Sequence, residues 1–373
     1  MRIVALVIVV AALAGCSRHS FERFFSSGQH YLAAKKYSEA AIEFQNAIRA
    51  NPQSIEAQMK LGDAYAALGQ PGNAAAAYER ACSIDSRNVA ACVQAAAQLL
   101  GLGQYSDAAA GARVVLAADR FNLDAQLILA SSLAGVRRFA DAEERLQAAV
   151  AAAPGEARAY RALGELQWRR GNTKAAEASL LHAIELNPES ADARVSLAQM
   201  YLENGRVADG ERQLRAALDA KPEDLAANRA FASYLVTTNE CANAEQYWQT
   251  VAAQSTDGSG ILSLADYYVW SGRPDDALNV LSRVSQADDS GGAARSRMAS
   301  ILYDRGDRPK AARIVDELLE HEQSSVDGLL LKARMALDDG DAGTAREYVH
   351  RAAGIAPDAP AVREMLGKET AQP

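Results

Sequence analysis

The chain has 373 residues, enough for two or three ordinary domains or for one long repeat array. Its 39 Lys and Arg residues against 47 Asp and Glu residues give a formal charge of -8, and no long block of one sign occurs, which argues against a nucleic-acid partner. Aromatic residues make up only 6% of a chain that is 49% hydrophobic, so Ala, Leu and Val dominate and helices are favoured.

The first segment of the chain is an apolar run from Ile3 to Ala14 behind the single positive residue Arg2. At 12 residues it is too short to span a membrane and is typical of a signal-peptide core. The run ends in the letters LAGC, which resemble a bacterial lipobox, where the cysteine is acylated and becomes the mature N-terminus. This resemblance implies a signal peptide over residues 1–15 and a lipidated Cys16 with a short tether over 16–20. A plain secretory signal and a buried core helix are the alternatives.

The remainder of the chain repeats itself every 34 residues, except for one step of 33 between Leu225 and Gly258. Residues 159–190, "AYRALGELQWRRGNTKAAEASLLHAIELNPES", join two helical patterns around a turn, and the same arrangement recurs at 57–86 and 193–222. This pattern resembles the tetratricopeptide repeat (TPR), a helix-turn-helix unit. The repeats are predicted to start at Phe21, Ile55, Val89, Leu123, Ala157, Ala191, Leu225, Gly258, Gly292 and Val326.

Small residues recur at two fixed positions of the repeat, counted from the first residue of each repeat. Position 8 is Gly or Ala in all ten repeats, and position 20 is Ala in nine and Gly210 in the other. The resemblance implies an all-α fold, a right-handed α-solenoid of about ten repeats over 21–359, followed by a capping helix and tail over 360–373. Gly- and Ser-rich turns mark 225–325 as the loosest part of the array, with ordinary repeat drift as the alternative explanation.

No catalytic or metal-binding pattern is evident in the sequence. The five histidines lack metal-ligand spacing, and the glycines fall at turns or at position 8, not in a phosphate-binding loop. Because the repeats account for nearly every residue after the tether, no stretch remains for a catalytic domain. We therefore expect a protein that is not an enzyme and that needs no cofactor and no metal.

Three cysteines follow Cys16. Cys82 ends the second helix of one repeat and Cys92 lies in the first helix of the next, so the two are predicted neighbours. A disulfide between them suits an exported chain, whereas two separately buried thiols would act as small hydrophobic residues. The sequence leaves this choice open, and Cys241 has no evident partner.

The first helices of a TPR array line its concave face, so the resemblance implies a partner-binding groove there. In this chain the early groove is apolar and its middle carries Arg, Trp and Tyr, the residue types typical of binding hot spots. The alternative is that these side chains only pack on the neighbouring helix. The predicted groove residues are Met59, Val93, Leu100, Leu127, Arg158, Arg161, Trp168, Arg169, Trp270 and Tyr303.

The predicted function is that of a lipid-anchored scaffold or adaptor for protein or peptide partners. The resemblance to bacterial TPR lipoproteins implies a role in assembling a cell-envelope export, pilus or surface-polymer machine, including exopolysaccharide export. The alternative is a regulatory or substrate-binding subunit of an envelope enzyme that acts on glycans or exported proteins. Ser17, in place of an inner-membrane retention Asp, favours an outer-membrane lipoprotein. We expect the protein to face the periplasm and to contact the membrane through its lipid only, although the sequence does not specify the leaflet. Repeat folds are reused for unrelated ligands, so the partner itself is not specified.

Overall fold

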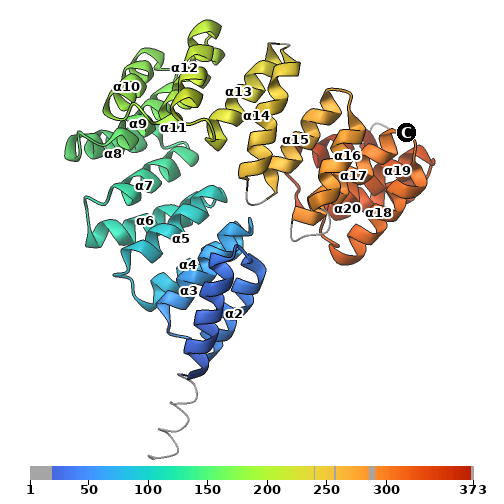
Figure 1. Cartoon of the computed structure of the whole chain (residues 1–373), viewed down its shortest axis with the longest axis horizontal. Helices are drawn as coiled ribbons and strands as arrows, with labels where there is room; N and C mark the ends of the chain where they lie inside the picture. Colours follow the sequence, from blue (N-terminus) through green and yellow to red (C-terminus); the bar gives the residue numbers. More distant parts are fainter. Residues whose placement is uncertain (1–18, 239, 256–257, 285–289, 371–373) are drawn as a thin grey trace, which may run out of the picture. The chain divides into compact units, whose positions relative to one another are not determined.

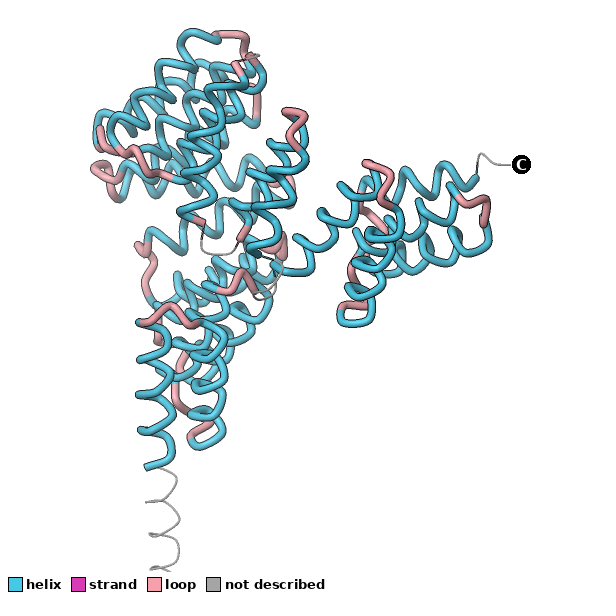
Figure 2. Tube along the Cα trace, turned by 45° about the vertical axis from the view of Figure 1, so that its right-hand side comes forward, coloured by secondary structure: helices cyan, strands magenta, loops and turns pink. Residues whose placement is uncertain are grey.

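The computed structural model describes residues 19–238, 240–255, 258–284 and 290–370. Within these ranges the chain consists of helices joined by turns and loops, with no strand, and the predicted all-α repeat fold is confirmed (Figure 2). The predicted signal peptide and Cys16 lie outside the described residues. The chain divides into two compact units, Met1–Tyr234 and Leu235–Pro373, and this division falls within the segment predicted to be loosest.

The N-terminal unit is a succession of antiparallel helix pairs (Figure 1). Its first described helix covers residues 19–33. The following helices are α2 (Tyr37–Ala50), α3 (Ile55–Ala67), α4 (Pro71–Ile84), α5 (Val89–Gly101), α6 (Tyr105–Ala118), α7 (Leu123–Gly135), α8 (Phe139–Ala152), α9 (Ala157–Arg169), α10 (Thr173–Leu186), α11 (Ala191–Glu203) and α12 (Val207–Ala220). Helix α13 (Leu225–Thr237) runs across the division between the two units.

The C-terminal unit continues the same alternation of first and second helices. Its helices are α14 (Cys241–Gln254), α15 (Ser259–Trp270), α16 (Pro274–Val284), α17 (Ser290–Asp304), α18 (Arg308–His321), α19 (Val326–Asp338), α20 (Ala342–Ile355) and α21 (Pro360–Thr370). Helix α21 begins at the residue where the capping helix was predicted to begin.

Polar caps place the starts of the first helices. The Ser54 hydroxyl accepts a hydrogen bond from the Ala57 amide at 3.2 Å, so that α3 begins at Ile55, the predicted start of its repeat. The side chain of Asn88 caps α5 in the same way. Helix α15 begins one residue after the predicted Gly258, because Gly258 has φ 74° and lies in the left-handed region. Helix α17 begins at Ser290, two residues before the predicted start.

Position 8 is small because a second-helix side chain lies directly against it. At Gly62 an added Cβ would lie 2.5–2.7 Å from three atoms of the Tyr78 ring. Tyr78 is only 3% exposed, and its hydroxyl donates to Asp63 at 2.9 Å. Burial, together with this carboxylate, raises the pKa of the Tyr78 hydroxyl.

A recurring polar cluster connects successive repeats. The Tyr201 hydroxyl and the Arg206 guanidinium both donate to Glu177, at 2.7 and 2.9 Å, and Arg206 also donates to Asp209 at 2.7 Å. The Arg206 guanidinium stacks 4.0 Å from the centre of the Tyr201 ring. Burial raises the pKa of Tyr201 to about 12, and the hydrogen bond from Tyr201 lowers the pKa of Glu177. The same arrangement recurs with Tyr268, Arg273, Glu245 and Asp276.

Candidate functional site

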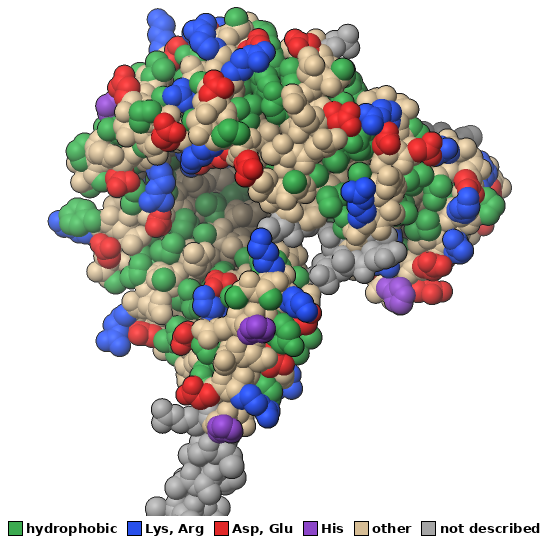
Figure 3. All heavy atoms as spheres, in the orientation of Figure 1, with side chains coloured by type: hydrophobic (Ala, Val, Ile, Leu, Met, Phe, Trp, Pro, Cys, Tyr) green, Lys and Arg blue, Asp and Glu red, His purple; other side chains and the backbone are tan. Residues whose placement is uncertain are grey.

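The first helices of each unit form a layer of their own. In the N-terminal unit α5 contacts α7, α7 contacts α9, and α9 contacts α11; in the C-terminal unit α15, α17, α19 and α21 are in contact in the same way. Over the described ranges, no two second helices of successive repeats contact each other to a comparable extent. We call the surface of this layer the inner face. Figure 3 shows a hollow in the N-terminal unit with hydrophobic side chains on its wall.

A pocket of about 250 Å³ opens on the inner face of α5, α7 and α9. Leu100, Ala130, Ala134 and Leu166 supply an apolar lining, and Leu166 is only 4% exposed. Leu100 is one of the predicted groove residues, and it packs against the core of the N-terminal unit.

Small residues on α7 make room for this pocket. Ala130, Ser131, Ala134 and Gly135 all line it, so no long side chain of α7 enters the space. A Cβ at Gly135 would collide with the ring of Tyr105, which forms another part of the wall. Ser131 and Tyr105 were not among the predicted groove residues. The signal was present, because five of the last six residues of α7 are Ala, Ser or Gly.

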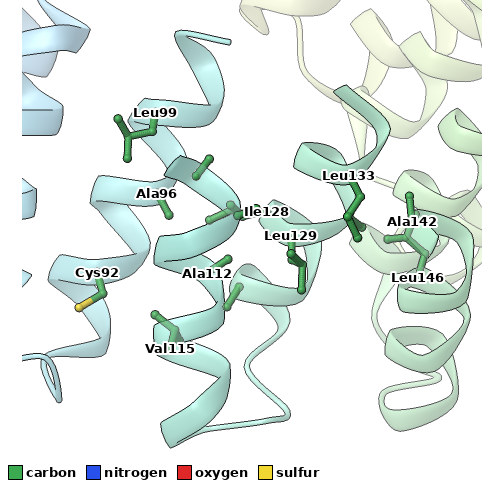
Figure 4. Close-up of a cluster of buried hydrophobic side chains, with 14 of the residues drawn as sticks. Cys92, Ala96, Leu99, Ala112, Val115, Ile128, Leu129, Leu133, Ala142 and Leu146 are labelled. Carbon is green, nitrogen blue, oxygen red and sulfur yellow. The ribbon is translucent and has the colours of Figure 1, made fainter. Parts of the chain in front are cut away.

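The pocket lies over a continuous hydrophobic core. Figure 4 shows side chains of α5, α6, α7 and α8 that point into the space between these helices. Leu146 belongs to this core and also lines the pocket, while Leu133 of the same core is 6% exposed. The pocket wall is therefore held by buried residues of several helices.

Two charged side chains of α9, Glu165 and Arg169, line the pocket, and the other arginines of this helix have acidic partners. Arg161 donates to Glu165 at 2.8 Å, and the Ser196 hydroxyl donates to the same carboxylate oxygen at 2.6 Å. Arg158 forms an ion pair with Asp124 at 2.7 Å. Arg169 lines the pocket and is exposed, and its guanidinium has no hydrogen bond or ion pair with any described residue.

Other predicted groove residues of the N-terminal unit are partly buried. Met59 packs against Tyr78 and its neighbours, and Val93 and Leu127 pack against the same core as Leu100. Trp168 packs against a cluster that includes Leu180, Leu197 and Tyr201. Only part of each of these side chains is therefore exposed on the inner face.

The C-terminal unit has a different inner face. Trp270 is 55% exposed at the end of α15, and the neighbouring Val269 is 45% exposed. Tyr303, which was predicted to line the groove, is only 6% exposed. Its hydroxyl donates to Asp338 of the next repeat, so it offers little surface to a partner.

A second depression, of about 460 Å³, lies on the inner face of α17, α19 and α21. Its two arginines already have carboxylate partners: Arg297 donates to Asp266 at 2.8 Å, and Arg334 pairs with Asp304 at 2.8 Å. This depression therefore differs from the pocket of the N-terminal unit, where one guanidinium is unpaired.

The disulfide question left open by the sequence has an answer in the structure. The Sγ atoms of Cys82 and Cys92 are bonded at 1.99 Å, with Cα atoms 4.9 Å apart, and the bond joins α4 to α5. Cys241 is a free cysteine. Among the described residues, no group of three or more His, Cys, Asp or Glu side chains is arranged to hold a metal ion. No described helix is both long enough and apolar enough to cross a membrane.

Solved structures resemble this fold over part of the chain. A tetratricopeptide repeat protein from Parabacteroides merdae is 16% identical, with coverage of 67% of this chain and 99% of that one and a TM-score of 0.53. A thermophilic TPR protein of Thermus thermophilus is 25% identical, with coverage of 49% and 100% and a TM-score of 0.45. The pilF protein of Pseudomonas aeruginosa is 21% identical, with coverage of 57% and 97% and a TM-score of 0.41. No curated protein matches the chain.

Family models match most of the repeat array. One tetratricopeptide repeat model matches residues 25–89, 129–191, 166–224 and 195–259, and another matches residues 268–335. The first of these models alone matches more than half of the chain. The chain belongs to the tetratricopeptide repeat family.

Proposed function

We propose that this protein is a scaffold that binds a segment of a protein or peptide partner on the inner face of its N-terminal unit. The observation that carries the proposal is the pocket between α5, α7 and α9, which combines an apolar lining with charged side chains at its border. Tetratricopeptide repeat proteins bind protein or peptide partners and are typically non-catalytic scaffolds. Apolar pockets with a few placed polar groups are common binding sites in proteins.

The test is to fill the pocket from an exposed position. Ser131→Trp places a large ring in the pocket without replacing a core residue, since Ser131 is exposed. Gln147→Trp adds the same ring to an exposed position of the second helix α8 and serves as the control. We expect Ser131→Trp to reduce partner capture from envelope extract at least tenfold and Gln147→Trp to leave it unchanged. Equal capture by both variants would refute the inner-face site.

We also propose that the scaffold is anchored by a lipid on Cys16 to the outer membrane and faces the periplasm. The support is the apolar run from Ile3 to Ala14 followed by the lipobox-like LAGC. The first described helix begins at residue 19, three positions after Cys16 in the sequence. Cys16→Ser should move the protein from the membrane fraction to the soluble fraction. Retention of the variant in the membrane fraction would contradict the anchor.

Such an anchored scaffold would serve the assembly of an envelope export, pilus or surface-polymer machine. The alternative is a regulatory or substrate-binding subunit of an envelope enzyme. The identity of the captured partner distinguishes the two functions. Capture of an export channel or another outer-membrane protein supports assembly, and capture of a hydrolase or transferase supports the alternative. In either case the capture must be lost in Ser131→Trp to be assigned to the pocket.

A further inference from the structure

We infer that the pocket between α5, α7 and α9 selects peptide segments in which an apolar side chain lies next to the acidic side chain of an Asp or Glu. This inference rests on the proposed function, because it specifies the ligand of the same pocket. It depends on two features of the pocket, the size and apolar lining of its interior and the charge at its border.

The interior has room for a single side chain, and part of its lining is apolar. Its volume of about 250 Å³ lies below the usual range for small-molecule and cofactor sites, which is about 300–1,000 Å³. Leu100, Ala130, Ala134 and Leu166 offer hydrocarbon atoms to whatever enters. An aliphatic side chain of a peptide would lose its contact with water there and gain a close-packed environment.

The border of the pocket favours a carboxylate. Glu165, the acidic side chain that lines the pocket, already accepts hydrogen bonds from Arg161 and Ser196, so its charge is balanced within the protein. Arg169 is exposed and has no carboxylate partner among the described residues. An acidic side chain next to the bound apolar residue would meet this guanidinium without displacing an existing ion pair.

The same guanidinium disfavours basic segments. Figure 3 shows both basic and acidic side chains beside the hollow of the N-terminal unit, but Arg169 is the cation that lines the pocket. A basic side chain at the same place in a peptide would be repelled by this guanidinium group, so the charge at the border discriminates between acidic and basic segments.

The experiment uses the full chain in detergent and short fluorescein-labelled Gly-Ser peptides, acetylated and amidated, with a central Leu-Glu, Leu-Gln or Leu-Lys pair. We expect the Leu-Glu peptide to bind about threefold to fivefold more tightly than Leu-Gln, as for an exposed ion pair, and Leu-Lys to bind more weakly than both. Fluorescence anisotropy gives the dissociation constants. The preference for Leu-Glu should weaken as salt is added.

Arg169→Gln should abolish the difference in affinity between the Leu-Glu and Leu-Gln peptides. Arg170→Gln is the matched control, because Arg170 is the next residue and already pairs with Glu143. It should preserve the preference for Leu-Glu. The affinities of the unchanged protein and of Arg169→Gln, each for Leu-Glu and for Leu-Gln, form a double-mutant cycle that isolates the interaction between Arg169 and the peptide carboxylate.

Three results would overturn the inference. The first is a preference for Leu-Glu that persists in Arg169→Gln. The second is an equal gain for a peptide that ends in Leu with a free C-terminal carboxylate, which would assign the guanidinium to a chain end instead of an internal acidic residue. The third is that none of the peptides binds. The proposed function is judged separately, by partner capture with Ser131→Trp.

Discussion

The disulfide between Cys82 and Cys92 should stabilise the junction between two successive repeats. It joins the last turn of α4 to α5 across a sequence separation of 10 residues. In the loop-closure model, a closed loop of 10 residues lowers the entropy of the unfolded chain by about 9 cal/mol/K, which corresponds to about 2.7 kcal/mol at 25 °C. Reduction should therefore destabilise the connection between these two repeats by up to this amount.

The effect should be local, because the stability of a repeat array is a sum over repeats and their interfaces. A loss of about 2.7 kcal/mol raises the population of the locally opened state about a hundredfold. Hydrogen exchange followed by mass spectrometry should show this loss of protection in α4 and α5 after reduction, with α10 and α11 unchanged. The variant Cys82→Ala/Cys92→Ala should exchange like the reduced protein, since Cys92 is 1% exposed and Ala keeps its site apolar.

Two results would refute this reasoning. Alkylation of the protein before reduction, with Cys82 and Cys92 both modified, would show that the bond does not form in solution. If the bond forms and α4 and α5 keep full protection after reduction, the packing of the two helices already supplies their stability. The free Cys241 provides an internal reference for the alkylation, since it is half-buried and has no disulfide partner.

Three further predictions concern the repeats themselves. The hydrogen bond from Tyr201 is the main cause of the lowered pKa of Glu177. The ionised Glu177 therefore stabilises the fold above about pH 4.3, and this stabilisation is lost as the pH falls through the pKa of the folded state. In urea unfolding, the stability of Glu177→Gln should depend less on pH in this range. Lys35 has φ 58°, so Lys35→Gly should raise stability by about 0.5–1 kcal/mol in thermal unfolding, whereas Lys35→Ala, which keeps a Cβ in the left-handed region, should not. Gly62→Ala should lower the free energy of unfolding by about 1–3 kcal/mol, because the added methyl group would collide with the ring of Tyr78. Gly72→Ala, at a position with open space, should not lower it. A Gly62→Ala variant that is more stable than the unchanged protein would contradict the close contact between Gly62 and Tyr78.

The repeat phase was readable from the sequence because the interactions that set it are local. Ser54 and Asn88 cap the helices that follow them within three residues, and the glycines at position 8 (Gly28, Gly62 and Gly164) each face a side chain of their own second helix. The offset at Gly258 arises from a backbone conformation, which residue identity only suggests. The start of a repeat can therefore be predicted from the sequence, because the caps and close contacts that set it involve residues near one another in the chain.

The exposure of the groove residues was harder to predict, because it depends on the neighbouring repeat. Tyr303 and Trp270 both occupy inner-face positions near the end of a first helix, and both were predicted to line the groove. Tyr303 is only 6% exposed, and its hydroxyl donates a hydrogen bond to Asp338 of the next repeat, while Trp270 remains 55% exposed. The period of the helix assigns a face to each residue, but contacts between repeats decide how much of its side chain is left for a partner.

Contacts between side chains also distinguish the arginines of α9, all of which were predicted to line the groove. Arg158 pairs with Asp124 of the preceding repeat and Arg161 pairs with Glu165 one turn away, so a partner carboxylate would have to compete with an existing acidic group at either of them. Arg169 borders the pocket with no such competitor among the described residues. Because an exposed ion pair contributes only about 0.2–1 kcal/mol, exchanging one carboxylate for another at Arg158 or Arg161 would bring little net affinity. Selectivity for an acidic peptide therefore depends on Arg169, which is why its substitution, and not that of the paired arginines, tests the inferred ligand.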